Sequence, residues 1–231
     1  MLGPAKHIGL IGGIGPAATE FFYRGLVNAY AAAERVMDLT IVHSDARQLV
    51  KHLSAGDQAA QAQVFLPLVE RLQAAGADAV AVTSMGGHFC VTALEAVSPL
   101  PVLNVIPTLE RYFAEKGIKR VGLLGTRTVT ETRVYGGIPA VDCVLPEGPD
   151  LDRVHDNYVA MATAASVTDA QRDTFFRVGR DLHARGAEAV MLSGTDLFLA
   201  FEGQDCGFPV IDAAEVHIEA IFRWSLGAGE L

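Results

Sequence analysis

Cysteine is scarce in this 231-residue chain. Cys90, Cys143 and Cys206 form no CxxC pair and show no metal-ligand spacing with histidine, so the sequence predicts no metal site. A sparse, odd-numbered set of cysteines is typical of the reducing cytoplasm, where we expect the protein to be. We expect the Cys90 and Cys143 thiols to be buried and the Cys206 thiol to be exposed in a loop.

Basic residues and long apolar segments are also scarce. The chain has 18 Lys and Arg against 27 Asp and Glu, a net charge of −9, which argues against nucleic acid or an anionic membrane as a partner. No stretch approaches the roughly 20 apolar residues that span a bilayer. The N-terminal apolar run lacks a cleavage-site pattern and is interpreted as a first strand.

Short β-branched runs alternate with longer stretches of helical periodicity, which predicts parallel sheets covered by helices on both faces. The expected strands are residues 7–13, 39–44, 78–84, 101–106, 120–126, 142–145, 188–194 and 209–213. The expected helices are residues 16–33, 56–75, 87–96, 108–115 and 170–185, with a last helix from residue 214.

This pattern occurs twice in the chain. IGLIGG at residue 8 recurs as VGLLGT at 121 (offset 113), and GADAVAVTS at 76 recurs as GAEAVMLSG at 186 (offset 110). The repeat predicts two doubly wound α/β lobes, residues 1–103 plus 213–231 and residues 104–212. Ligands of such sheets bind beyond the carboxyl ends of the strands. We therefore expect one cleft between the lobes, with Ser84 and Gly194 on opposite walls.

The opening GLIGGIGPAAT resembles the glycine-rich start, GGxGPxAT, of the aspartate/glutamate racemase family. The blocks ADAVAVTSMGGHF, PVLNVI, GAEAVMLSGTDL and FPVIDAAEVH follow in that family's order, so the resemblance covers residues 7–222. It implies a cofactor-independent enzyme that acts on a small carboxylate, and a homodimer. The family's lysine for a distal carboxylate is missing near Met161, which implies that the substrate is not a simple dicarboxylic amino acid.

The resemblance fails at the two thiols with which that family moves protons. In this sequence the first thiol position falls on Ser84 and the second on Gly194. Serine without an adjacent base is a poor proton acceptor and glycine offers no group, so two-thiol racemisation is not expected. Two classes stay open: an isomerase, racemase or C–C lyase that works through an enolate-like carbanion, and a non-catalytic ligand-binding or regulatory relative.

Four residues are candidates for proton transfer: His88, Ser84, Asp45 and Asp196. A histidine titrates near neutral pH, and we expect His88 to be neutral and to accept a proton or activate Ser84. Its alternative role is a bond to neighbouring backbone. The alternatives for the carboxylates are a surface ion pair of Asp45 with Arg47 and a helix-terminal position for Asp196.

A larger set is expected to bind the substrate through hydroxyl groups, backbone amides at helix starts, a guanidinium, and the space that a glycine leaves. Its members are Gly13, Ile14, Gly15, Arg47, Thr83, Met85, Gly86, Thr126, Thr128, Gly194 and Thr195. The opening glycines lack the GxGxxG spacing, so a dinucleotide is not predicted. Gly194 is expected to leave room for a bulky substituent.

Overall fold

A computed structural model describes residues 5–229, which divide into two compact units. Unit 1 comprises the chain up to Val105 and again from His217, and unit 2 is Ile106–Val216. The chain enters unit 2 at the start of α5 (Val105–Lys116) and returns to unit 1 within α10 (Ala213–Ser225). Each unit holds one parallel sheet with helices, which confirms the predicted α/β class with two lobes.

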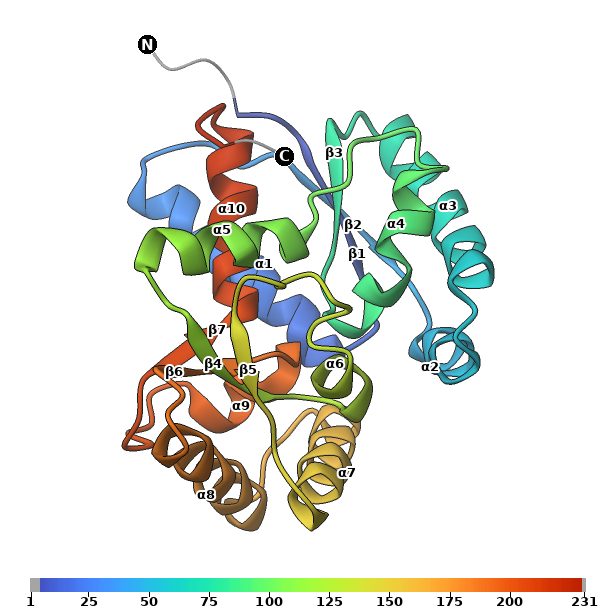
Figure 1. Ribbon diagram of the computed structural model, residues 1–231. Coiled ribbons are helices and arrows are strands. Elements are labelled where there is room, and N and C mark those ends of the chain that lie inside the picture. Colours follow the sequence, from blue (N-terminus) through green and yellow to red (C-terminus); the bar gives the residue numbers. More distant parts are fainter. Residues whose placement is uncertain (1–4, 230–231) are drawn as a thin grey trace. The chain divides into compact units, whose positions relative to one another are not determined.

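Unit 1 has a three-stranded sheet of order β2-β1-β3. Its strands are β1 (Ile8–Gly12), β2 (Leu39–His43) and β3 (Ala79–Val82). Its helices are α1 (Pro16–Ala32), α2 (Ala46–Ala55), α3 (Gln58–Ala74), the 3-10 helix η1 (Gly86–Cys90) and α4 (Val91–Glu95). Helices α1 and α10 lie on one side of the sheet and α3 and α4 on the other (Figure 1). Helix α3 packs through an apolar face that includes Phe65, Val69 and Leu72.

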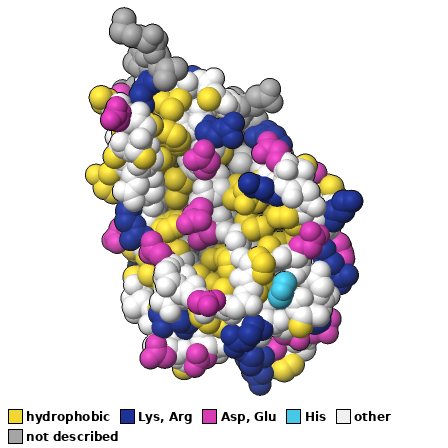
Figure 2. Space-filling model, turned by 90° about the vertical axis from the view of Figure 1, so that its left-hand side faces the viewer, with side chains coloured by type: hydrophobic (Ala, Val, Ile, Leu, Met, Phe, Trp, Pro, Cys, Tyr) yellow, Lys and Arg dark blue, Asp and Glu magenta, His cyan; other side chains and the backbone are white. Residues whose placement is uncertain are grey.

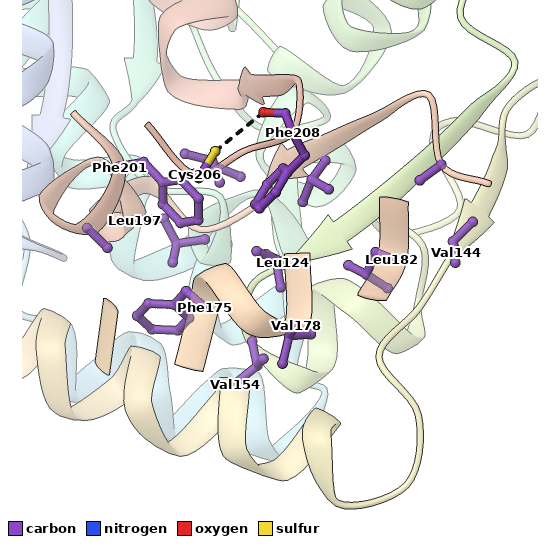
Figure 3. Close-up of a cluster of buried hydrophobic side chains, with 14 of the residues drawn as sticks. Leu124, Val144, Val154, Phe175, Val178, Leu182, Leu197, Phe201, Cys206 and Phe208 are labelled. Carbon is purple, nitrogen blue, oxygen red and sulfur yellow. Dashed lines mark hydrogen bonds between the residues drawn. The ribbon is translucent and has the colours of Figure 1, made fainter. Parts of the chain in front are cut away.

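Unit 2 has a four-stranded sheet of order β5-β4-β6-β7. Its strands are β4 (Arg120–Leu124), β5 (Asp142–Val144), β6 (Ala189–Leu192) and β7 (Val210–Asp212). Besides α5, its helices are α6 (Arg127–Glu131), α7 (Pro149–Ala164), α8 (Asp169–Ala184), η2 (Thr195–Leu197) and α9 (Phe198–Phe201). Helix α8 begins at a capping box formed by Thr168 and Gln171 and places Phe175, Val178 and Leu182 in the apolar core (Figure 3).

The sequence repeat is preserved in individual hydrogen bonds. In unit 1 the amide and the hydroxyl of Thr83 both donate to the Ile11 carbonyl, at 3.1 and 3.2 Å. In unit 2 the amide and the hydroxyl of Ser193 both donate to the Leu124 carbonyl, at 2.7 Å each. The segments that follow β3 and β6 therefore leave their sheets in the same way.

The predicted strand at residues 101–106 is wrong except for one bridge, which pairs Val102 with Val80. The chain then turns at once into α5, which begins at Val105, before the predicted start at residue 108. Helices α2, α6 and α7 were not predicted. The 16-residue α7 buries only Val154 and Met161, so its apolar periodicity is too weak to read.

The surface mixes acidic, basic and apolar side chains, as one face of the molecule shows (Figure 2). Exposed apolar side chains of the described residues include Tyr23, Val36, Val50 and Val159. Within residues 5–229, no helix is both long and apolar enough to cross a bilayer.

We predict that Gly122→Ala lowers the free energy of unfolding by about 1–3 kcal/mol, because overpacking of a core forces side chains to shift. A Cβ at position 122 would lie 2.9 Å from the Leu182 Cβ and 3.4 Å from the Ala187 Cβ. Urea unfolding of Gly86→Ala is the control, since its nearest neighbour is the Ser84 Oγ at 3.6 Å. Equal stability of the two variants would contradict the tight packing.

Candidate functional site

Ser84 is the accessible hydroxyl at the carboxyl end of β3. Its side chain is half-buried, and its Oγ accepts the Gly87 amide at 3.3 Å. Within the described part of the chain the Ser84 hydroxyl donates to no acceptor, so it is available to a ligand oxygen. The neighbouring Thr83 is fully buried and its hydroxyl donates to the Ile11 carbonyl, which makes Thr83 a structural residue here.

His88 lies in the interior of unit 1, where 2% of its surface is exposed. Its Nδ1 donates to the Ser84 carbonyl oxygen at 2.7 Å, which is the backbone alternative and not the predicted contact with the Ser84 hydroxyl. The ring meets His217 edge to face, with centroids 5.5 Å apart. Burial lowers the pKa of His88 to about 4, so the imidazole is neutral at pH 7.

The glycine turn after β1 is tied together by its own residues. The Gly13 amide donates to Thr19 Oγ1 at 2.8 Å, and the Thr19 hydroxyl donates to the Gly15 carbonyl at 3.0 Å. Gly13 has a φ of +86°, which favours glycine, and a Cβ there would lie 2.2 Å from His43 Nδ1. The Gly13 amide is thus engaged within the protein and not held ready for an anion.

Two more predicted binding residues lie beside this turn. A Cβ on Gly87 would lie 3.5 Å from Ile14 Cδ1, so Ile14 packs close to the start of η1. Met85 is buried, and its carbonyl accepts the His88 amide at 3.1 Å. The structure therefore brings Ile14, Met85 and Gly86 together around the Ser84 segment within unit 1.

Asp45 and Arg47 form the surface ion pair that was the alternative to a substrate role. Asp45 caps α2 by accepting the Arg47 amide at 2.8 Å, and the guanidinium of Arg47 donates to both of its carboxylate oxygens. Hydrogen bonds from Arg47 lower the pKa of Asp45 to about 2, so Asp45 is a weak base. The Arg47 side chain is 89% exposed.

The expected empty space at Gly194 is filled, which corrects that interpretation. A Cβ at position 194 would lie 2.4 Å from Cε2 and 2.8 Å from Cζ of Tyr158, whose ring comes from α7. The Tyr158 hydroxyl donates to Asp196 Oδ2 at 3.0 Å. Asp196 is 5% exposed and the adjacent Thr195 is also buried. Sequence reasoning missed Tyr158, because the helix that carries it was not recognised.

The ionisation of Tyr158 is strongly disfavoured. Desolvation by burial raises its pKa well above the usual value, and the negative charge of Asp196 raises it further. The phenol of Tyr135 contributes in the same direction. Tyr158 is therefore a neutral donor at physiological pH, and Asp196 is the acceptor of its hydrogen bond.

Tyr135 belongs to an unusual left-handed turn between α6 and β5. Arg133, Val134 and Tyr135 have φ values of 50°, 57° and 59°, and Gly136 follows at 72°. Left-handed backbone costs a non-glycine residue roughly 1–2 kcal/mol. Such strain persists only where the surroundings enforce it, and it is concentrated at functional sites.

The loop after β4 adds polar groups to unit 2. Thr126 is the N-cap of α6, and its Oγ1 is buried without a hydrogen-bond partner in the described part of the chain. The Thr128 carbonyl accepts the Thr132 hydroxyl at 2.6 Å. The amide of Arg127 donates to His155 Nδ1 at 3.2 Å. His155 and Tyr158 are three residues apart on α7 and share one face of that helix.

The thiols show no sign of activation. Cys206 is 6% exposed and its Sγ donates to the Phe208 carbonyl at 3.4 Å, so the predicted exposed thiol is buried (Figure 3). Burial raises the pKa of Cys90 to about 12. Cys143 is half-buried, and burial also raises its pKa. Among residues 5–229, no group of three His, Cys, Asp or Glu side chains could hold a metal ion.

The buried imidazoles predict a loss of stability in acid. Between about pH 4 and 6.5 the unfolded chain binds a proton at position 88 that the folded protein does not, so the free energy of unfolding falls as the pH falls. His217, whose pKa burial lowers to about 3, acts in the same sense. Asp212 acts in the opposite sense, because burial raises its pKa to about 7.

Comparison with His88→Asn isolates the contribution of residue 88. The variant should show a shallower dependence of unfolding free energy on pH between 4.5 and 6.5, by up to about 1.4 kcal/mol per pH unit. Urea unfolding at a series of pH values measures both slopes. Parallel curves for the two proteins would show that His88 is not held neutral by burial.

Most of the chain matches known proteins. The sequence matches the Asp/Glu/Hydantoin racemase family over residues 11–221. A Yersinia pestis protein assigned as an Asp/Glu racemase is 25% identical, with a TM-score of 0.81 over 96% of this chain and 99% of its own. Aspartate racemase of Picrophilus torridus is 21% identical, with a TM-score of 0.79 over 95% and 94%. An aspartate racemase homologue from Pyrococcus horikoshii is 20% identical, with a TM-score of 0.77 over 95% and 99%.

Proposed function

Because the chain belongs to the Asp/Glu/hydantoin racemase family, we propose that it is an enzyme that moves a proton at a carbon next to a carboxylate. Removal of that proton leaves an enolate-like carbanion, which an isomerase or a racemase protonates again. A C–C lyase reaches the same kind of carbanion by breaking a C–C bond, and the carbanion then takes up a proton. The reaction needs a base for the proton and donors for the developing negative charge, and it needs no cofactor.

The observation that carries this proposal is the buried carboxylate of Asp196 with the Tyr158 hydroxyl 3.0 Å from its Oδ2. Asp196 lies just beyond the carboxyl end of β6, where the sheets of this fold class bind ligands. A carboxylate removed from bulk water and oriented by a fixed donor is suited to act as a general base. We assign that role to Asp196.

Ser84 is the proposed donor to the substrate carboxylate. Its hydroxyl is half-buried at the carboxyl end of β3 and donates to nothing else among the described residues. His88 supports this segment from the interior through its bond to the Ser84 carbonyl. Asp45 and Arg47 are left out of the proposed machinery, because they neutralise each other at the surface.

The substrate class follows from the same features. We propose a small carboxylate, because Ser84 offers a neutral hydrogen-bond donor for it and Asp196 offers a base. We also propose that the protein works as a homodimer in the cytoplasm, as the family resemblance and the sparse cysteines predict.

Solvent exchange tests the proposed reaction without knowledge of its product. The protein is incubated in D₂O with aspartate, glutamate, their hydantoins and 2-hydroxy acids, and loss of the α-proton signal is followed by NMR. We expect exchange with at least one of these classes. Asp196→Asn should lower the rate by about 10²- to 10⁴-fold, since it removes the base. Ser84→Ala should weaken binding by about 10-fold.

A protein with all three cysteines changed to alanine is the matched control. It should keep its exchange activity, because no thiol takes part in the proposed step. Loss of exchange in that variant with the fold intact, or full exchange in Asp196→Asn, would refute the assignment. Calorimetric binding of one of these acids without any exchange would identify a ligand-binding relative instead.

A further inference from the structure

Tyr158 and Gly194 interlock in unit 2. The ring of Tyr158 comes from α7 and occupies the volume that any side chain at position 194 would need, with Cε2, Cζ and Cδ2 within 2.4–3.1 Å of an added Cβ. The hydroxyl of the same ring reaches past Gly194 to Asp196. One aromatic side chain thus contacts both the glycine and the carboxylate two residues later.

We propose that Tyr158 is the positioning residue of the Asp196 base, and that position 194 is glycine because this ring takes the place of a side chain there. The inference rests on the proposed function, because it assumes that Asp196 accepts a proton from the substrate. It adds a residue that the sequence repeat does not mark, since α7 stands in the element order where α2 stands in the first half, and neither helix belongs to the repeated blocks.

A phenol is suited to this task. It donates one hydrogen bond to a single carboxylate oxygen, and its planar ring has few rotamers once one face is packed against backbone. Gly194 supplies that backbone, because only a residue without a Cβ permits the approach. Burial beside Asp196 keeps the phenol protonated, so it remains a donor over the whole physiological pH range.

The interlock also excludes a thiol at position 194. A cysteine there would place its Cβ 2.4 Å from the ring, well inside van der Waals contact, so the ring and a side chain at 194 exclude each other. In this unit the proposed base is therefore the carboxylate of Asp196, and the hydroxyl of Tyr158 from α7 orients it. Tyr135, in the strained left-handed turn, adds a second phenol to the surroundings of Tyr158.

A double-mutant cycle in stability tests the interlock without any substrate. Gly194→Ala, Tyr158→Ala and the double variant are unfolded in urea beside the unchanged protein. Gly194→Ala should lower the unfolding midpoint clearly in the native background and hardly at all in the Tyr158→Ala background, where the ring is gone. Additive effects of the two substitutions would overturn the interlock.

The pH dependence of solvent exchange tests the positioning role. Tyr158→Phe keeps the ring on Gly194 and removes only the donor to Asp196. Without this donor the Asp196 carboxylate binds a proton more readily. The acidic limb of the pH profile, where the exchange rate falls as the pH is lowered, should therefore move to higher pH by about one unit. Tyr23→Phe on the exposed face of α1 is the control and should leave the limb in place.

The two experiments separate the inference from the proposed function. If the unchanged protein exchanges protons and the acidic limb does not move in Tyr158→Phe, the positioning role is wrong and the proposed function stands. If the unchanged protein shows no exchange with any of the acids tested, the proposed function and the positioning role both fall. The double-mutant cycle then still decides whether Tyr158 is the reason for glycine at 194.

Discussion

In each unit, one helix approaches the central strand so closely that only glycine fits beneath it. In unit 1 a Cβ on Gly9 would lie 2.9 Å from Leu72 Cδ1 of α3, and in unit 2 a Cβ on Gly122 would lie 2.9 Å from the Leu182 Cβ of α8. This contact sets the distance between sheet and helix in each unit.

The two units differ at the residue that follows the first residue beyond β3 and β6. Thr83 and Ser193 are both buried and both bond back to the central strand, but Ser84 and Gly194 follow them. Unit 1 presents a half-buried hydroxyl at this point. Unit 2 presents bare backbone on which an aromatic ring from another helix is packed. The two units therefore share these hydrogen bonds but present chemically different groups at the carboxyl ends of β3 and β6.

The sequence was sufficient for the parts of the fold that depend on apolar pattern. The buried strands, and the helices α3 and α8 that each bury one apolar face, produce a readable pattern, and the repeat of IGLIGG and GADAVAVTS shows that it occurs twice. Helix α7 escaped because only two of its side chains are buried. Because α7 was not predicted, Tyr158 and His155 on that helix were missed as well. The Tyr158 hydroxyl donates to Asp196, and His155 accepts the Arg127 amide.

The sequence pattern left alternative roles open for several candidate site residues, and local hydrogen bonds distinguish between those roles. The sequence places His88 four residues after Ser84, a spacing that allows contact with either the hydroxyl or the carbonyl of Ser84. The 3-10 turn at Gly86 directs the imidazole to the carbonyl and into the core. In the same way, Asp45 and Arg47 are close enough to pair, and the cap of α2 brings them together. The hydrogen-bond partner of each of these side chains is thus set by the conformation of a single turn of backbone.

A glycine in place of a nucleophile is usually interpreted as lost chemistry, and the packing around Gly194 suggests another interpretation. The Tyr158 ring lies where a side chain at position 194 would be, and its hydroxyl donates to the carboxylate of Asp196, two residues later in the same segment. The interior of a protein leaves few voids, so a missing side chain must be compensated by a neighbour. In this chain the neighbour that fills the space also brings a hydrogen-bond donor. Packing and hydrogen bonding at the end of β6 are therefore linked through one side chain, because the ring that fills the space at Gly194 also carries the hydroxyl that donates to Asp196.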